Sequence, residues 1–249
     1  MGALAVAERL ELARGLLRRM EDRSAAAVRP VPESDGRVLP VAGPLARLLP
    51  AGGLRRGSTV ALPHAPGSTS LLLALLAEAS ADGAWAAVVG KPGLGLVAAS
   101  EAGVRLERLA LVPDPGPDLM AVTVALLDGI DVVVVAGAER AGVRAAERQR
   151  LAARARQRGA VLVALGAWPG ADLELSCTDA LWQGLGAGAG RLAARQVRVR
   201  LRGRGVTPAG RSAGLLLPGA GGAVAAAPEP GAKPVERIRG RLDVERVAG

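Results

Sequence analysis

Short apolar runs and longer helical stretches alternate along the middle of the chain. The apolar runs have the length and the β-branched content of buried strands, and they occupy residues 58–62, 84–89, 108–112, 131–136 and 160–165. The helical stretches that separate them occupy residues 68–81, 94–102, 117–128 and 143–158. Because "DVVVVA" at 131–136 is apolar on both faces, the pattern predicts an α/β fold whose mainly parallel central sheet is flanked by helices.

The pattern changes after residue 170. The stretches "ADLELSCT", "RQVRVRLRG" and "SAGLLLPG" follow one another without helical segments, which predicts antiparallel strands at the C-terminal side of the sheet. Within 195–202, apolar residues alternate with arginines, and the arginines are Arg198, Arg200 and Arg202. A strand would therefore carry a row of guanidinium groups on one face. The row either contacts phosphate or acidic groups of a partner, or is the solvated side of an edge strand.

Both ends of the chain differ from this central part, so we expect three units: residues 1–37, 38–218 and 219–249. An amphipathic helix is predicted at 3–24, followed by a connector. Residues 219–234 have the low complexity of a linker, and a weakly amphipathic tail follows. The apolar positions of these end segments, with the arginine row, are candidate partner contacts. They are Leu10, Leu17, Ile238 and Leu242.

Composition narrows the classes of function. The chain has 249 residues, 50% of them hydrophobic, but neither Phe nor Tyr. Ala, Leu and Val must fill the core, and nucleic-acid recognition by ring stacking is disfavoured. The net charge of +9 indicates a polyanionic or acidic protein partner, or reflects a bias toward Ala, Arg, Gly and Pro.

Cysteine and histidine are too few for a disulfide framework or a zinc site. The single Cys177 lies in an apolar alternating stretch, where it is expected to fill the core, and the single histidine is His64. The chain lacks a signal-peptide pattern and an apolar run of membrane-spanning length. We therefore expect a cytoplasmic protein without a membrane partner.

The stretch "LPHAPGST", Leu62–Thr69, joins a strand to a helix, which is the setting of a Walker A loop, G-x-x-x-x-G-K-[ST]. It keeps Gly67 and Thr69, but Leu62 replaces the first glycine and Ser68 replaces the lysine. Gly67, Ser68 and Thr69 at a helix N-terminus retain a weak capacity to hold an anion. The favoured interpretation is that Ser68 and Thr69 cap the helix.

The order of features resembles the RecA-type recombinase core over residues 38–204. The resemblance is carried by "GGLRRGSTVALPHAPGSTSLLLALLAEASADGAWAAVVG" and by "DGIDVVVVAGA". It implies three catalytic positions: the Walker A lysine at Ser68, the acidic residue that positions water at Lys91, and the Walker B aspartate at Ala136. None of them has the required group, so the resemblance predicts no ATP hydrolysis, no cofactor and no metal. The connectors after 136 and 165 leave little room for the two DNA-binding loops of recombinases.

Further phrases resemble the actinobacterial ImuA-prime family, whose members are catalytically degenerate RecA relatives. These are "LLPAGGLRRGSTVAL", "LERLALVPDPGPD" and "GAVLVALGAWPGADL". The resemblance implies a non-catalytic accessory factor of SOS-induced translesion synthesis, which binds ImuB in a complex with an error-prone DnaE-type polymerase. RecA and DNA are further candidate partners, and association with the nucleoid during DNA damage would follow. Two alternatives stay open: a nucleotide-dependent DNA-binding RecA paralogue, and an SOS inhibitor of cell division.

Overall fold

A computed structural model describes residues 36–186 and 189–228. The helix expected at 3–24, with Leu10 and Leu17, and the tail with Ile238 and Leu242 lie outside these residues. No helix in the described ranges combines the length and the apolarity needed to span a membrane.

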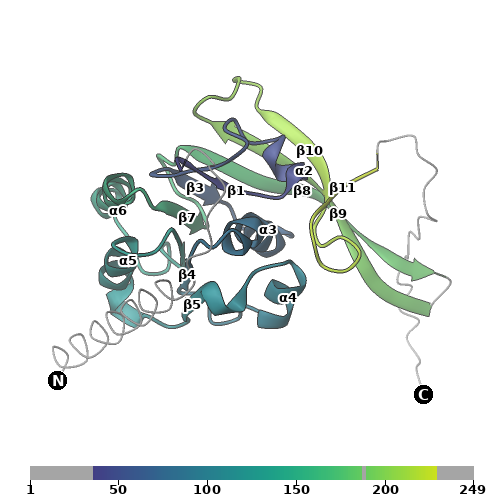
Figure 1. The fold of residues 1–249 in the computed structure, drawn as a ribbon, viewed down its shortest axis with the longest axis horizontal. Helices are drawn as coiled ribbons and strands as arrows, with labels where there is room; N and C mark the ends of the chain where they lie inside the picture. The colour runs from purple at the N-terminus through teal and green to yellow at the C-terminus, as the bar shows by residue number, and fades with distance from the viewer. Residues whose placement is uncertain (1–35, 187–188, 229–249) are drawn as a thin grey trace, which may run out of the picture.

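A nine-stranded sheet organises the chain, in the order β11-β10-β9-β8-β3-β7-β6-β4-β5 (Figure 1). The parallel strands are β3 (Thr59–Leu62), β4 (Ala86–Val89), β5 (Leu109–Val112), β6 (Val132–Ala136) and β7 (Val161–Leu165). The C-terminal strands are β8 (Leu173–Gly186), β9 (Ala189–Gly203), β10 (Arg211–Leu216) and β11 (Ala225–Ala226). Strand β8 runs parallel to β3, and β9, β10 and β11 continue the sheet in antiparallel pairs. The predicted α/β class, mainly parallel sheet and antiparallel extension are confirmed.

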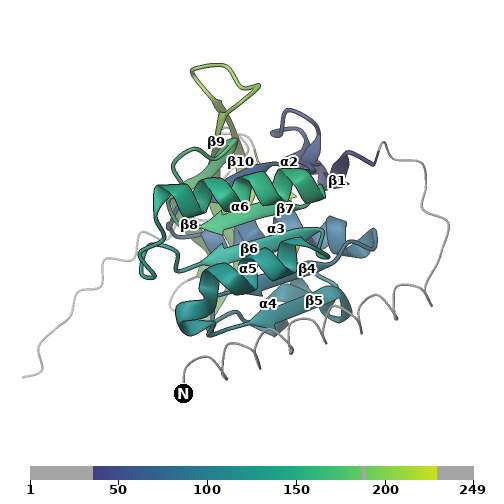
Figure 2. The same cartoon turned by 90° about the vertical axis from the view of Figure 1, so that its left-hand side faces the viewer.

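Helices cover the two faces of the sheet unequally. Helices α3 (Ser68–Ala81) and α4 (Leu96–Glu101) pack on one face, and their apolar cluster continues over β8, β9 and β10. Helices α5 (Leu119–Leu127) and α6 (Ala145–Arg158) pack on the other face, over the parallel strands only (Figure 2). On that second face, no helix of the described residues covers the half of the sheet formed by β8, β9 and β10.

Smaller elements complete the described part. Strands β1 (Val38–Pro40) and β2 (Gly53–Arg55) pair antiparallel around the short helix α2 (Gly43–Ala46). The 3-10 helices η1 (Leu106–Arg108) and η2 (Gly116–Asp118) flank β5. The sequence of residues 44–57, "PLARLLPAGGLRRG", predicts a short helix and a glycine turn here. It does not predict the two strands, because three residues are too few to show an alternation.

Two expectations about the C-terminal half are wrong. Strand β9 is not an edge strand, since β8 and β10 flank it on either side. The composition of residues 219–234 predicts a linker, yet within the described part, 219–228, Ala225 and Ala226 pair with β10, and the Ala227 N–H donates to Gly214 O at 2.9 Å. Residues 229–234 lie outside the described residues. Small residues here allow close packing rather than disorder: a Cβ on Gly222 would lie 2.5 Å from Glu101 O.

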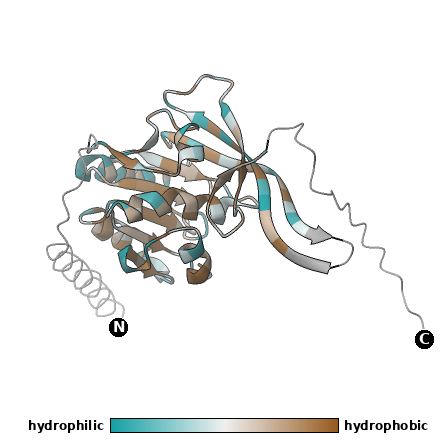
Figure 3. Cartoon of the chain, turned by 45° about the vertical axis from the view of Figure 1, so that its right-hand side comes forward, coloured by the Kyte–Doolittle hydropathy of each residue, from teal (hydrophilic) through white to brown (hydrophobic). Residues whose placement is uncertain are grey.

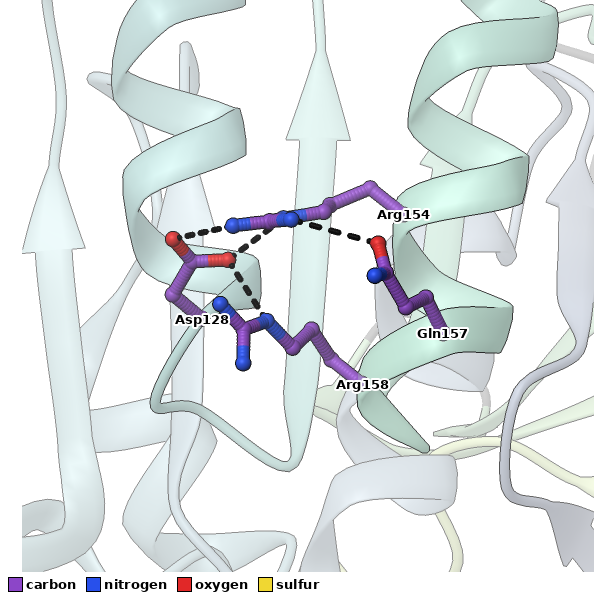
Figure 4. Close-up of polar contacts among 4 residues, drawn as sticks. All are labelled: Asp128, Arg154, Gln157 and Arg158. Carbon is purple, nitrogen blue, oxygen red and sulfur yellow. Dashed lines mark hydrogen bonds and ion pairs between the residues drawn. The ribbon is translucent and has the colours of Figure 1, made fainter.

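Helices α5 and α6 are joined at one end by a carboxylate. Asp128, directly after α5, accepts two hydrogen bonds from Arg154, at 2.6 and 2.7 Å (Figure 4). Arg158 donates to the same carboxylate at 3.1 Å, and Arg154 also donates to Gln157. Hydrogen bonding to Arg154 lowers the pKa of Asp128 below its ordinary value.

The β8–β9 ribbon extends well beyond the rest of the sheet (Figure 3). A shift of register between Thr178 and Leu181 marks the point at which it departs. Asp179 lies at this shift with φ of 54°, the one non-glycine residue with positive φ in the described ranges. A bulge of this kind bends the strand and increases its twist. We call residues 179–186 of β8 and 189–195 of β9 the arm.

Candidate functional site

A cleft of about 500 Å³ opens at the carboxyl ends of β4, β6 and β7, and we call it the strand-end cleft. The chain leaves β4 toward α4 on one face and leaves β6 toward α6 on the other face. Adjacent strands whose connections diverge in this way form a topological switch point. In open α/β sheets, ligands bind outside the carboxyl ends of the strands at such a point.

Three glycines form the floor of the cleft, and each follows the last residue of its strand. Gly90, Gly137 and Gly166 have φ of 78°, 75° and 131°. A Cβ on Gly90 would lie 2.4 Å from Ala136 O, and one on Gly166 would lie 3.2 Å from His64 Nε2. The backbone conformation therefore favours glycine at all three positions, and at Gly90 the nearby backbone oxygen also leaves no room for a Cβ. The sequence carries a signal for these positions, because each glycine directly follows an apolar run.

The polar side chains of the cleft are mainly cationic. Lys91 and Arg140 line it, and within the described ranges neither forms an ion pair. Glu139 supplies a carboxylate, whose Oε1 accepts the Ala167 N–H at 2.9 Å, and His64 lies beside Gly166. The described residues include no cluster of metal-ligating side chains. This charge balance suits an anionic group better than a divalent cation.

The structure brings two of the three candidate catalytic positions together and separates the third. Lys91 and Ala136 line the strand-end cleft, whereas Ser68 does not. The Ser68 side chain is only 5% exposed. Its Oγ donates to Pro63 O at 2.6 Å and accepts the Ala65 N–H at 3.0 Å. The loop before α3 is thus closed by its own hydroxyl group.

The interpretation of Ser68 and Thr69 as helix caps is wrong. Gly67 is the N-cap residue of α3, with φ of 110° and no side-chain cap. Ser68 is already helical, and its hydroxyl points back into the loop. A Cβ on Gly67 would lie 3.3 Å from Cys177 Sγ, so the loop also packs against β8. Cys177 is buried, as expected for a residue that fills the core.

The arginine row lies away from the cleft, on the uncovered half of the sheet. Arg198, Arg200 and Arg202 are exposed, and the apolar residues between them are buried, which confirms the alternation. Arg198 pairs with Asp179 at 3.2 Å. The other two arginines have no ion pair within the part of the chain that the structure describes.

Sequence reasoning missed the apolar side chains of the arm. Leu181, Trp182 and Leu192 are 50%, 44% and 49% exposed. Their signal was available in "ALWQGLGAGAG", an apolar stretch without charge that is too rich in glycine for a buried strand.

These features define an α/β protein with a glycine-floored cleft at the switch point of its sheet. Residues 47–170, which contain β3 to β7 and the cleft, match the family model described as MT3502 N-terminal domain. The chain is also 38% identical over 156 residues to the uncharacterized protein Rv3395c of Mycobacterium tuberculosis. The aligned region covers 61% of this chain and 68% of that protein. The chain belongs to this family. The arm lies beyond the range of the family model.

Proposed function

We propose that this chain is a non-catalytic, RecA-like protein of the ImuA-prime type. In this role it serves SOS-induced translesion synthesis by binding ImuB, in a complex with an error-prone DnaE-type polymerase. The resemblance of its sequence to ImuA-prime proteins supports the partner and the pathway. The geometry of the strand-end cleft and of the loop before α3 supports the absence of catalysis.

The observation that carries this proposal is the closed loop at Ser68. Phosphoryl transfer on a P-loop requires backbone N–H groups and a lysine that surround the phosphates, and a carboxylate that holds Mg²⁺. Here the hydroxyl of Ser68 is committed to Pro63 and Ala65. Ala136 offers a methyl group at the end of β6, and the ammonium of Lys91 repels a divalent cation.

A protein that keeps a RecA-like fold but does not hydrolyse ATP acts through the surfaces with which it binds other molecules. Two surfaces of this chain suit a partner: the arginine row on the uncovered half of the sheet, and the exposed apolar side chains of the arm. Net positive charge favours an acidic partner and increases its rate of association.

Binding and hydrolysis should be measured on one preparation of the full chain. We expect the immobilised chain to retain purified ImuB, and its ATP hydrolysis with Mg²⁺ to equal the rate in buffer. A Lys91→Met variant should hydrolyse no ATP either. The proposal would be overturned if the wild type hydrolysed ATP and the Lys91→Met variant did not. It would also be overturned if the immobilised chain failed to retain ImuB.

The cationic cleft favours one second candidate, a DNA-binding RecA paralogue that responds to a nucleotide. Lys91 and Arg140 offer charges to phosphates, and the arginine row offers charges to a nucleic-acid backbone. This candidate predicts Mg²⁺–ATP binding in calorimetry and an affinity for single-stranded DNA that falls steeply with salt. The accessory function predicts neither.

A further inference from the structure

We infer that the arm is the docking site for an extended segment of a partner protein, apolar along most of its length and acidic at one end. The segment adds as a strand to the outer edge of β8 beyond Thr178. This inference rests on the proposed function, because it places the contact with the protein partner on named residues.

The arm concentrates exposed apolar surface. Among the described residues, seven large apolar side chains are exposed, and three of them, Leu181, Trp182 and Leu192, lie on the arm. Soluble proteins seldom leave Trp and Leu exposed together unless a partner covers them, and Trp is enriched among the residues that dominate binding energy. The arm is therefore the most marked candidate interface of the described part.

The backbone of the arm has unpaired edges. Strand β8 pairs with β3 only at Leu173 and Glu174, and β9 pairs with β10 only from Gln196 to Leu201. Within the described ranges, no strand pairs with the outer edge of β8 beyond Glu174, and the edge of β9 is unpaired only before Arg195, whose backbone bonds to Leu217 and Pro218. Natural proteins protect such edges with charged residues or proline. The sequence between Asp179 and Arg191 contains neither, so this edge is suited to pairing with another chain.

The arm is held in place at its base. Arg195 lies over the Trp182 ring, and its guanidinium also donates to Ser70 Oγ of α3 and to Leu217 O, each at 2.8 Å. Asp179 fixes the bend through its positive φ and its ion pair with Arg198. A site that is ordered before binding loses less conformational entropy when the partner arrives.

Charge along the ribbon specifies the chemistry of the partner. Leu181 opposes Gln196, so its side chain lies on the same face as Arg198 and Arg200, whereas Trp182 opposes Arg195 on the other face. Alternate side chains of an added strand contact both faces, and they are expected to be apolar along the arm. The end of the strand nearest the sheet is expected to be acidic, because Arg200 lies on the same face opposite Ser176 and has no ion pair among the described residues. Nucleic acid fits poorly along the β8 edge, because residues 179–186 include no cation to meet phosphates.

The first test measures the affinity of the full chain for immobilised ImuB. We expect Trp182→Ala, and separately Leu181→Ser combined with Leu192→Ser, to weaken binding at least about tenfold. The matched control is Val97→Ser on α4, a residue 74% exposed and remote in sequence from the arm, which should change the affinity less than about twofold. Melting temperature and circular dichroism of each variant confirm that it is folded. If both arm variants bound ImuB with the affinity of the wild type, the inference would be overturned, but the proposed function would still stand.

A second probe separates the inference from the identity of the partner. A short synthetic peptide of alternating Val and Thr with glutamates at one end should bind the full chain, and the Trp182→Ala variant should lose this binding. The same peptide with arginines in place of the glutamates should bind at least about tenfold more weakly. Equal binding of both peptides, or none by the glutamate peptide, would overturn the inference. Displacement of the peptide by single-stranded DNA would overturn the inference as well. So would analytical sedimentation that showed the arm joining two copies of this chain and no binding of the peptide.

Discussion

The guanidinium carbon of Arg195 lies 4.9 Å from the centroid of the Trp182 ring. The same guanidinium reaches α3 through Ser70 and the end of β10 through the Leu217 carbonyl. One side chain thus joins the arm, a helix and the C-terminal strands. Burial lowers the pKa of Arg195, but guanidinium groups remain protonated at physiological pH.

Replacing Arg195 should destabilise the fold. An Arg195→Leu change removes two hydrogen bonds from the cation and leaves Leu217 O and Ser70 Oγ without this donor. We expect the free energy of unfolding in urea to fall by about 2 kcal/mol. Arg202→Leu on the same strand is the control and should change it by no more than about 0.5 kcal/mol. Equal effects of the two changes would show that the contacts of Arg195 contribute nothing.

Asp179 should tolerate only residues that accept positive φ. Asn and Gly populate the left-handed region readily, whereas β-branched residues do not. We expect Asp179→Val to reduce stability by about 1–2 kcal/mol and Asp179→Gly by much less. Thermal unfolding of the two variants measures the difference. If Val and Gly were equally tolerated, the bend at the base of the arm would not depend on the backbone of this residue.

The hydroxyl of Ser68 should be needed for the loop before α3. Ser68→Ala leaves the Ala65 N–H and the Pro63 carbonyl without this partner, and should lower the free energy of unfolding by about 1–3 kcal/mol. Ser68→Lys forces a long cation into a buried position, so it should destabilise more and should not create Mg²⁺-dependent ATP hydrolysis. Ser100→Ala, at an exposed position of α4, is the control. Hydrolysis by the Ser68→Lys variant would contradict the closed-loop account.

The Asp128 ion pair should make stability depend on pH. Since hydrogen bonds from Arg154 lower the pKa of Asp128 in the folded protein, its contribution is complete above the ordinary value of 3.8. The contribution is lost as the pH falls through the lowered pKa. Asp128→Asn should therefore reduce the urea midpoint at neutral pH, and the difference from wild type should shrink in acid. Asp82→Asn, at an exposed residue without an ion pair in the described ranges, should show no such trend.

Cys177 should be unreactive while the protein is folded. Burial raises the pKa of its thiol to about 11, and the thiolate is the reactive form. A thiol reagent at mildly alkaline pH should modify Cys177 slowly in the native protein and rapidly in urea. Rapid native modification would show that the contact between the loop and β8 opens frequently.

Elements with clear periodicity were predictable from the sequence. The helix expected at 68–81 is α3 to the residue, and the five apolar runs became β3 to β7 with end shifts of at most two residues. Leu151 lies among arginines in the helix predicted at 143–158, and its apolar side chain is fully buried. These features depend on local patterns of apolar residues, which a sequence displays directly.

Features that depend on distant contacts were not predictable. The partners of Ser68 are backbone atoms of its own loop, and a hydroxyl that caps a helix has the same sequence signal as one that closes a loop. The neighbours of β9 and the pairing of Ala225 are set by the order of strands, which composition does not encode. The strand-end cleft combines residues from three strand ends that are far apart in sequence.

The floor of that cleft has a consequence for protein engineering. Three of its lining residues, Gly90, Gly137 and Gly166, have positive φ, and a Cβ at Gly90 would lie 2.4 Å from the carbonyl oxygen of Ala136. Lys91, Ala136 and Arg140 line the same cleft and have no such backbone requirement. New side-chain chemistry is therefore best introduced at Lys91, Ala136 or Arg140, with Gly90 kept as glycine.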